Sequence, residues 1–320
     1  MRKASVLACL WLTLINPLVA CAYRGSEGES RGEQGTSAMP WRHWQPERPP
    51  HAVILALHGF NDYSNAFQDF ARFATERGVA VHAYDQRGFG ANRDAGLWPG
   101  TDRLVGDLRA AIARLRAIHG DTPLYVLGES MGGAVAIEAA AGELLPIDGL
   151  ILVAPAVWGG DQFSVVYRAM LWLASTIAPG WKLTGRGLDI MPSDNIEMLK
   201  ALSADPLVIK GTRVDAIAGL VRLMDRALAD LGRVDQKVLV LVGDKDQIVP
   251  AGAFAALRQR LRTDDCTLIT YPQGYHMLLR DLQRQVVFED VLAWIDGRTP
   301  PSTRATPCPA KAVEIAGRSG

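Results

Sequence analysis

The 320-residue sequence has no excess of charge of either sign, because 34 basic side chains balance 34 acidic ones. It has no long run of Lys and Arg, which argues against a surface for nucleic acid. Only four cysteines are present and none forms a C-x-x-C pair, so zinc and thiol-redox motifs have no support. We find no Walker-type loop, no G-x-G-x-x-G loop after a strand and no fixed-period repeat. These absences argue against nucleotide-dependent, nucleic-acid-binding and solenoid proteins.

A long hydrophobic run is also missing, since the apolar stretch over residues 6–19 is too short for a comfortable membrane span. With its basic start, this stretch predicts a signal peptide over residues 1–20. The peptide ends Leu-Val-Ala-Cys, which resembles the bacterial lipobox, and the resemblance implies that Cys21 is lipidated and becomes the mature N-terminus. Ala22 follows instead of the Asp that retains lipoproteins at the inner membrane, so the resemblance places the protein at the periplasmic face of the outer membrane. An ordinary signal peptide with an unmodified Cys21 is the alternative.

Composition divides the rest of the chain into three parts. Residues 21–40 are rich in Gly, Ser, Glu and Arg and predict a flexible tether. Residues 41–297 hold the apolar patterns of a folded domain. Residues 298–320 are polar and Pro-rich and predict a disordered tail. Because Cys308 falls in that tail, we do not expect it to pair with Cys266.

Apolar strands alternate with amphipathic helices in the folded part. Because each strand is apolar throughout, we expect a mostly parallel sheet that helices cover on both faces, which is the α/β class. The alternation stops at about residues 156–232, which carry helical signals and no convincing core strand, so we expect a helical cap there. The expected strands are 53–57, 79–84, 124–127, 150–153, 238–242 and 267–271.

The central motif is Gly128-Glu129-Ser130-Met131-Gly132, between the strand at 124–127 and a run of small residues. A strand, a sharp turn and a helix in this order form a nucleophile elbow, which exposes a serine hydroxyl above the sheet. The glycines fit because side chains at such a turn would strike the neighbouring strand or helix. By itself the motif is weak, since chance alone gives it in roughly one chain in six of this composition. An ordinary serine on a Gly-rich turn is the alternative.

Two further groups follow later strands, where ligands sit in open parallel sheets. His276 is the candidate general base for Ser130, and Asp246 would hold the imidazole in the productive tautomer. The order Ser, Asp, His is the one expected of α/β-hydrolases. Asp244 is the rival to Asp246. The other histidines precede the fold, lie within a strand, end a helix or make a structural hydrogen bond; these are His43, His51, His58, His82 and His119.

An oxyanion hole needs two backbone N–H groups near the nucleophile. Met131 follows the serine and supplies one, and Phe60, in the loop after the strand at 53–57, is the best placed for the other. Asp85 and Arg87 look reactive, but we expect them to hold their own loop together.

These motifs, taken in order, resemble the monoacylglycerol lipase and lysophospholipase branch of the α/β-hydrolases. The resemblance covers about residues 40–296, and rests on residues 58–60, 85–90, 128–133, 243–250 and 274–276. It implies a capped α/β-hydrolase fold, no metal and no organic cofactor. One departure is Gly90-Ala91-Asn92, where relatives commonly carry a serine.

The expected activity is therefore that of a carboxylic ester hydrolase that forms an acyl-enzyme on Ser130. The resemblance implies monoacylglycerol or lysophospholipid as substrate, and Cys21 would tether the protein to a membrane. A small-ester carboxylesterase, a catalytically silent lipoprotein that binds an apolar ligand, and an acyltransferase are the alternatives. Acyl-chain length, head group and oligomeric state are left open by these residues.

Overall fold

The computed structural model describes residues 26–31, 39–159, 164–185, 187, 189–261, 263, 265–302 and 305–308. The expected signal peptide and Cys21 lie outside these residues. Within them, no helix is both long enough and apolar enough to cross a membrane.

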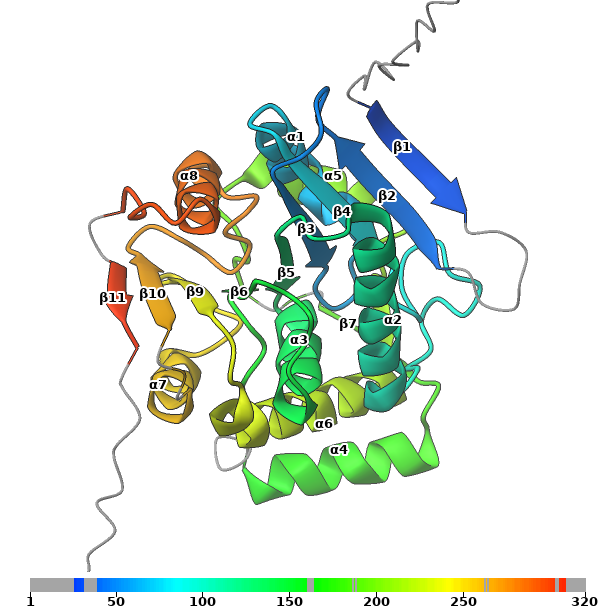
Figure 1. Cartoon of the computed structure of the whole chain (residues 1–320). Coiled ribbons are helices and arrows are strands. Elements are labelled where there is room, and N and C mark those ends of the chain that lie inside the picture. Colours follow the sequence, from blue (N-terminus) through cyan, green and yellow to red (C-terminus); the bar gives the residue numbers. More distant parts are fainter. Residues whose placement is uncertain are drawn as a thin grey trace, which may run out of the picture.

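A nine-stranded sheet forms the centre of the molecule (Figure 1). Its order is β1-β2-β4-β3-β5-β6-β9-β10-β11, and all neighbours from β4 to β10 pair in parallel. The strands are β1 (Ser26–Arg31), β2 (Pro40–Gln45), β3 (Ala52–Leu57), β4 (Val79–Tyr84), β5 (Leu124–Glu129), β6 (Gly149–Val153), β9 (Val238–Gly243), β10 (Cys266–Tyr271) and β11 (Ala305–Pro307). Every residue of β3, β4, β5, β6 and β9 is buried, as expected of strands covered on both faces. The predicted fold class is confirmed.

Helices cover both faces of this sheet and create two hydrophobic cores (Figure 1). One core packs the sheet against α2, α3, α6 and α7, and the other packs it against α1 and α8. The helices are α1 (Gln68–Thr75), α2 (Thr101–His119), α3 (Met131–Gly142), α6 (Val214–Asp230), α7 (Ala251–Arg260) and α8 (Arg284–Ile295), with 3-10 turns η1 (Ser64–Phe67) and η3 (Leu231–Arg233). The loops that follow the strands therefore start from a sheet that is packed on both faces.

Between β6 and β9 the chain leaves the sheet and forms the cap. The cap holds α4 (Val165–Ile177), α5 (Ile196–Ala204), α6 and a small antiparallel pair, β7 (Lys182–Thr184) with β8 (Gly211–Arg213). Helix α4 lies on the outside of α6 and has no buried residue (Figure 1). The sequence did not indicate β7 and β8, because three-residue strands carry too few positions for an alternating pattern.

Two expectations about the ends of the fold need correction, and the first concerns the tether. Residues 26–31 do not form a flexible segment but pair antiparallel with β2, with Glu27 opposite Trp44. An edge strand needs little burial, since backbone hydrogen bonds to one neighbour suffice to hold it. A composition rich in Gly, Ser and Glu therefore failed to reveal it.

The second correction concerns the tail and its cysteine. Residues 305–307 add an antiparallel strand to the other edge of the sheet, beside β10. Cys308 follows directly and forms a disulfide with Cys266, the first residue of β10. The sequence could not show this because the two cysteines lie 42 residues apart and only the pairing of the strands brings them together.

Candidate active site

Ser130 occupies the sharp turn between β5 and α3. Its backbone has φ 52° and ψ −114°, a left-handed conformation that costs free energy for any residue with a side chain. A Cβ atom on Gly128 would lie 2.5 Å from the carbonyl oxygen of Gly132, and one on Gly132 would lie 2.2 Å from the carbonyl oxygen of Leu57. Glycine is therefore required on both sides of the serine, as the motif predicts.

The loop after β3 lies against the nucleophile. A Cβ atom on Gly59 would be 3.4 Å from the Cβ atom of Ser130, so the loop comes close to the serine at the residue before Phe60. His58 fixes this loop: Gln86 N–H donates to its Nε2 at 2.9 Å, and its Nδ1–H donates to the carbonyl oxygen of Gly59 at 2.8 Å. Burial lowers the pKa of His58, so the ring stays neutral and can both donate and accept.

Met131, the other candidate donor, is the first residue of α3 and is fully buried. The first N–H groups of a helix have no acceptor within the helix, and the helix dipole favours negative charge at this end. The structure thus places Phe60 and Met131 in the two segments that adjoin Ser130. Their oxyanion role stays a prediction.

Asp246 and His276 meet directly, although 30 residues separate them. His276 Nδ1 lies 2.8 Å from Asp246 Oδ2, and Asp246 Oδ1 accepts from the N–H groups of Ile248 at 2.8 Å and Val249 at 2.9 Å. Both side chains are almost wholly buried. Asp244, the rival, is exposed, and its backbone N–H donates to the carbonyl oxygen of Tyr271.

A glycine contact holds the Asp246 and His276 loops together. A Cβ atom on Gly243 would lie 2.3 Å from the carbonyl oxygen of Gly274, and Lys245 N–H donates to that same oxygen at 2.9 Å. Residue types alone could not show this approach, because it depends on the pairing of β9 with β10.

Ser130 and His276 line one cavity of about 600 Å³, a size typical of small-molecule sites. The structure therefore brings the predicted nucleophile and base to one space beneath the cap. Most of the remaining wall is apolar and comes from the cap and from the loop after β9, with Trp158, Tyr167, Ile217, Leu220, Val221, Met224, Ile248 and Val249.

One end of this cavity is polar, and sequence reasoning missed it. Arg280 Nη1 lies 2.7 Å from Asp62 Oδ2, and Arg280 Nη2 lies 3.2 Å from Glu129 Oε2. Glu129 Oε1 and Arg280 Nε are buried and have no hydrogen-bond partner among the described residues. Burial raises the pKa of Glu129. These three residues come from segments far apart in the sequence, and only the position of Glu129 beside the nucleophile gave any signal.

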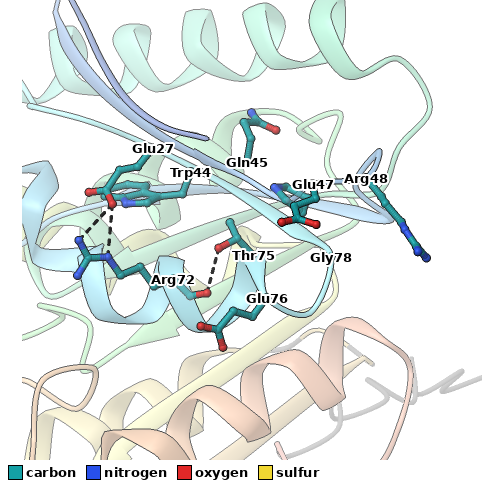
Figure 2. A pocket seen from close by; sticks show the side chains of 10 residues that line it. Glu27, Trp44, Gln45, Glu47, Arg48, Arg72, Thr75, Glu76 and Gly78 are labelled. Atoms are coloured by element: carbon teal, nitrogen blue, oxygen red, sulfur yellow. Dashed lines mark hydrogen bonds and ion pairs between the residues drawn. The ribbon is translucent and has the colours of Figure 1, made fainter. Parts of the chain in front are cut away.

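A second cavity, of about 630 Å³, lies where β1 and β2 approach α1, and Figure 2 shows the side chains that line it. Its wall carries Glu27, Glu47, Glu76, Arg48 and Arg72, and the ion pair of Arg72 with Glu27 at 3.2 Å lies within it. This lining contains neither Ser130 nor His276. The apolar cavity is therefore the one that suits an acyl substrate.

Within the part of the chain that the structure describes, no three His, Cys, Asp or Glu side chains are grouped so as to hold a metal ion.

Residues 48–283 match the family model described as serine aminopeptidase, S33. The chain belongs to this family of α/β-hydrolases. The match spans both the Ser130 elbow and the loops of Asp246 and His276, so the family assignment covers the whole candidate site.

Relatives of this S33 hydrolase include lipases. It is 29% identical over 257 residues to the monoacylglycerol lipase of Mycolicibacterium smegmatis, across 79% of this chain and 90% of that one. It is 24% identical over 271 residues to the monoglyceride lipase of Homo sapiens, across 83% of this chain and 89% of the human one. The crystal structure of Paleococcus ferrophilus monoacylglycerol lipase superposes with a TM-score of 0.70 at 22% identity, over 82% of this chain and 99% of that chain.

Proposed function

We propose that this S33 hydrolase cleaves the ester bond of monoacylglycerols. The observation that carries the proposal is the apolar cavity whose wall includes both Ser130 and His276. An acyl chain gains free energy when apolar side chains remove it from water, and the cap supplies such side chains. The monoacylglycerol lipases among the relatives match nearly the whole hydrolase domain and support the same substrate class.

The placement of the residues supports the following reaction. His276 removes the proton of the Ser130 hydroxyl, which attacks the ester carbonyl, while Asp246 keeps the imidazole oriented and stabilises its charged form. The N–H groups of Phe60 and Met131 stabilise the oxyanion. The alcohol leaves with a proton from His276, and an acyl-enzyme remains on Ser130. Water activated by His276 then releases the fatty acid.

The test is hydrolysis of p-nitrophenyl esters from acetyl to palmitoyl, followed by monoacylglycerols, with Ser130→Ala as control. We expect activity on medium or long acyl chains that the control lacks. A maximum at acetyl or butyryl would instead support a small-ester carboxylesterase. A folded protein without activity on any ester, and without fluorophosphonate labelling of Ser130, would support the silent binding lipoprotein.

The description of the family as aminopeptidases calls for a second assay. Amino-acid p-nitroanilides have an amide at the scissile position and a free amine beside it. The largely apolar wall of the cavity suits an acyl chain better than a charged amine, so we expect esters to be cleaved at least about 100-fold faster than anilides. The reverse ratio would assign the enzyme to peptides.

We propose further that Cys21 carries a lipid and holds the enzyme at the periplasmic face of the outer membrane of a bacterial envelope. The lipobox-like sequence supports this proposal. The disulfide between Cys266 and Cys308 supports an oxidising compartment, since disulfides are rare in the cytosol. Metabolic labelling with an alkyne fatty acid tests it: we expect label in the wild type, none in Cys21→Ala, and co-fractionation with outer membranes. Equal labelling of both proteins would refute it.

A further inference from the structure

Residues 191–195 of the cap, here called the cap loop, lie between β7 and α5 and bind both loops that carry the acid and the base. The Met191 N–H donates to Gln247 Oε1 at 2.9 Å, next to Asp246. The Met277 N–H, next to His276, donates to the carbonyl oxygen of Pro192 at 3.0 Å. The cap is therefore attached to the catalytic loops themselves and not only to the sheet.

A buried side-chain bond reinforces this attachment. Ser193 Oγ donates to Asp281 Oδ1 at 2.6 Å, and Asp281 Oδ2 accepts from the Tyr275 N–H at 2.7 Å. Ser193 is 0% exposed and Asp281 is 2% exposed. Asp281 thus links the cap loop to the residue that precedes His276.

The cap loop also bonds to the chain further along from His276, at Arg280 and Leu282. The Leu282 N–H donates to Asp194 Oδ1 at 2.8 Å, and Asn195 Nδ2 donates to the carbonyl oxygen of Arg280 at 2.9 Å. The segment 277–282 is therefore bonded to the cap loop from Met277, the residue after His276, to Leu282, two residues before α8.

We propose that the cap loop positions the general base, with Ser193 and Asp281 as the positioning residues. This inference rests on the proposed function. The backbone N–H groups on both sides of His276 are fixed, one by Asp281 and one by Pro192. The imidazole has to reach Ser130 and Asp246 together, and a displacement of about 1 Å can cost on the order of 100-fold in rate. The cap therefore acts on the rate of the chemical step as well as on acyl-chain binding.

The test compares Ser193→Ala, Ser193→Thr and the matched control Ser175→Ala in the full-length protein. Ser175 is also a cap serine, but its hydroxyl donates to the carbonyl oxygen of Trp172 within α4. The substrates are p-nitrophenyl acetate and decanoate, and a fluorophosphonate titrates the active sites so that kcat refers to folded, competent enzyme. Without Ser193 Oγ, Asp281 loses its bond to the cap loop.

We expect Ser193→Ala to lower kcat about 10-fold on both esters, with KM changed less than about twofold. Ser193→Thr, which keeps the hydroxyl, should recover most of the loss, and Ser175→Ala should match the wild type. If Ser193→Ala does not fold, Asp281→Asn, which keeps the side-chain volume, should show the same loss of kcat.

Three outcomes would overturn the inference. One is an unchanged kcat per titrated site, even with a lower Tm, because a purely structural role gives that result. Another is a rise in KM confined to decanoate, since that is the signature of acyl-chain binding. An equal loss in Ser175→Ala would show a general effect of cap serines. A wild-type protein inactive on all esters refutes the proposed function instead, and this inference with it.

Discussion

Asp244 and Asp246 are equivalent in residue type and two positions apart, yet their surroundings differ. The Asp246 side chain is buried, accepts two backbone N–H groups and contacts His276, whereas Asp244 is exposed. A carboxylate fixed in this way can hold the imidazole in one tautomer. Hydrogen bonding and burial, and not residue type, therefore favour Asp246 over Asp244 as the partner of His276.

The first prediction uses this pair. Asp246→Asn should lower kcat on p-nitrophenyl butyrate by about 10³- to 10⁴-fold. The neutral amide would favour the wrong tautomer of His276, and it would not stabilise the positive charge that the imidazole gains during the reaction. Asp244→Asn is the matched control and should stay within about threefold of the wild type. A larger loss in Asp244→Asn than in Asp246→Asn would reverse the assignment.

His82 shows how burial acts on a group outside the active site. Its Nε2 lies 3.1 Å from His119 Nε2 and 3.0 Å from Gln45 Nε2. Burial first, and then the nearby His119, His43 and Arg114, lower the pKa of His82 to about 3. The folded state therefore holds this ring neutral, while the unfolded state binds a proton below about pH 6.5.

The second prediction follows from that difference. Because the unfolded state takes up the proton first, His82 makes the free energy of unfolding fall as pH decreases from about 6.5 toward 3. Between pH 7 and 4.5 the wild type should lose roughly 2–3 kcal/mol more than His82→Gln, measured by urea unfolding at each pH. Parallel pH profiles for the two proteins would contradict this account.

Among the elements, the two edge strands differ from the interior ones in what holds them. Strand β11 has only three residues and pairs on one side, with β10. The Cys266–Cys308 disulfide joins it to the sheet. So short a strand gains few backbone hydrogen bonds, so we infer that the covalent link keeps this edge covered.

The third prediction concerns this disulfide. Cys308→Ser should lower the free energy of unfolding by about 2–4 kcal/mol, since the crosslink restricts the unfolded chain. Cys266→Ser should give the same loss, and reductant should lower the wild type to the level of either variant. Esterase activity at 25 °C should persist, because the bond lies away from the Ser130 cavity. A wild type whose stability does not respond to reductant would refute the role.

At the scale of the whole molecule, Arg280 connects three parts of the chain that are far apart in sequence. It pairs with Asp62 after β3 and with Glu129 at the end of β5, while its own backbone belongs to the segment after His276. All three side chains are buried. A buried charge that loses its partner is costly because the interior cannot solvate it as water does.

The fourth prediction tests this connection. Arg280→Met should lower the free energy of unfolding by about 3–5 kcal/mol, because two buried carboxylates lose their common partner. Arg233→Met, which breaks the exposed pair with Asp230, should cost less than about 1 kcal/mol. Urea unfolding at pH 7.5 measures both. Similar losses in the two variants would show that the buried Arg280 pairs contribute no more to the free energy of unfolding than an exposed ion pair does.

The sequence by itself determined the α/β class and the candidate groups Ser130, Asp246 and His276. Strands buried on both faces leave continuous apolar runs, and the elbow requires glycines at fixed spacing, so both features are local and visible along the chain. Each of the three groups follows a strand, and parallel strands end at one edge of the sheet, so the sequence also indicated that the three groups meet.

Only the tertiary structure showed which strands cover the edges of the sheet and which hydrogen bonds hold the loops of the site in place. Strand β1, strand β11 and the disulfide arise from pairing between distant segments, which leaves no periodic pattern in either partner. The cap loop and the Arg280 pairs are likewise hydrogen bonds between loops, and common residues such as Ser193 give no sign of them in sequence. Local patterns thus specified the elements and the chemistry, whereas long-range hydrogen bonding specified the geometry.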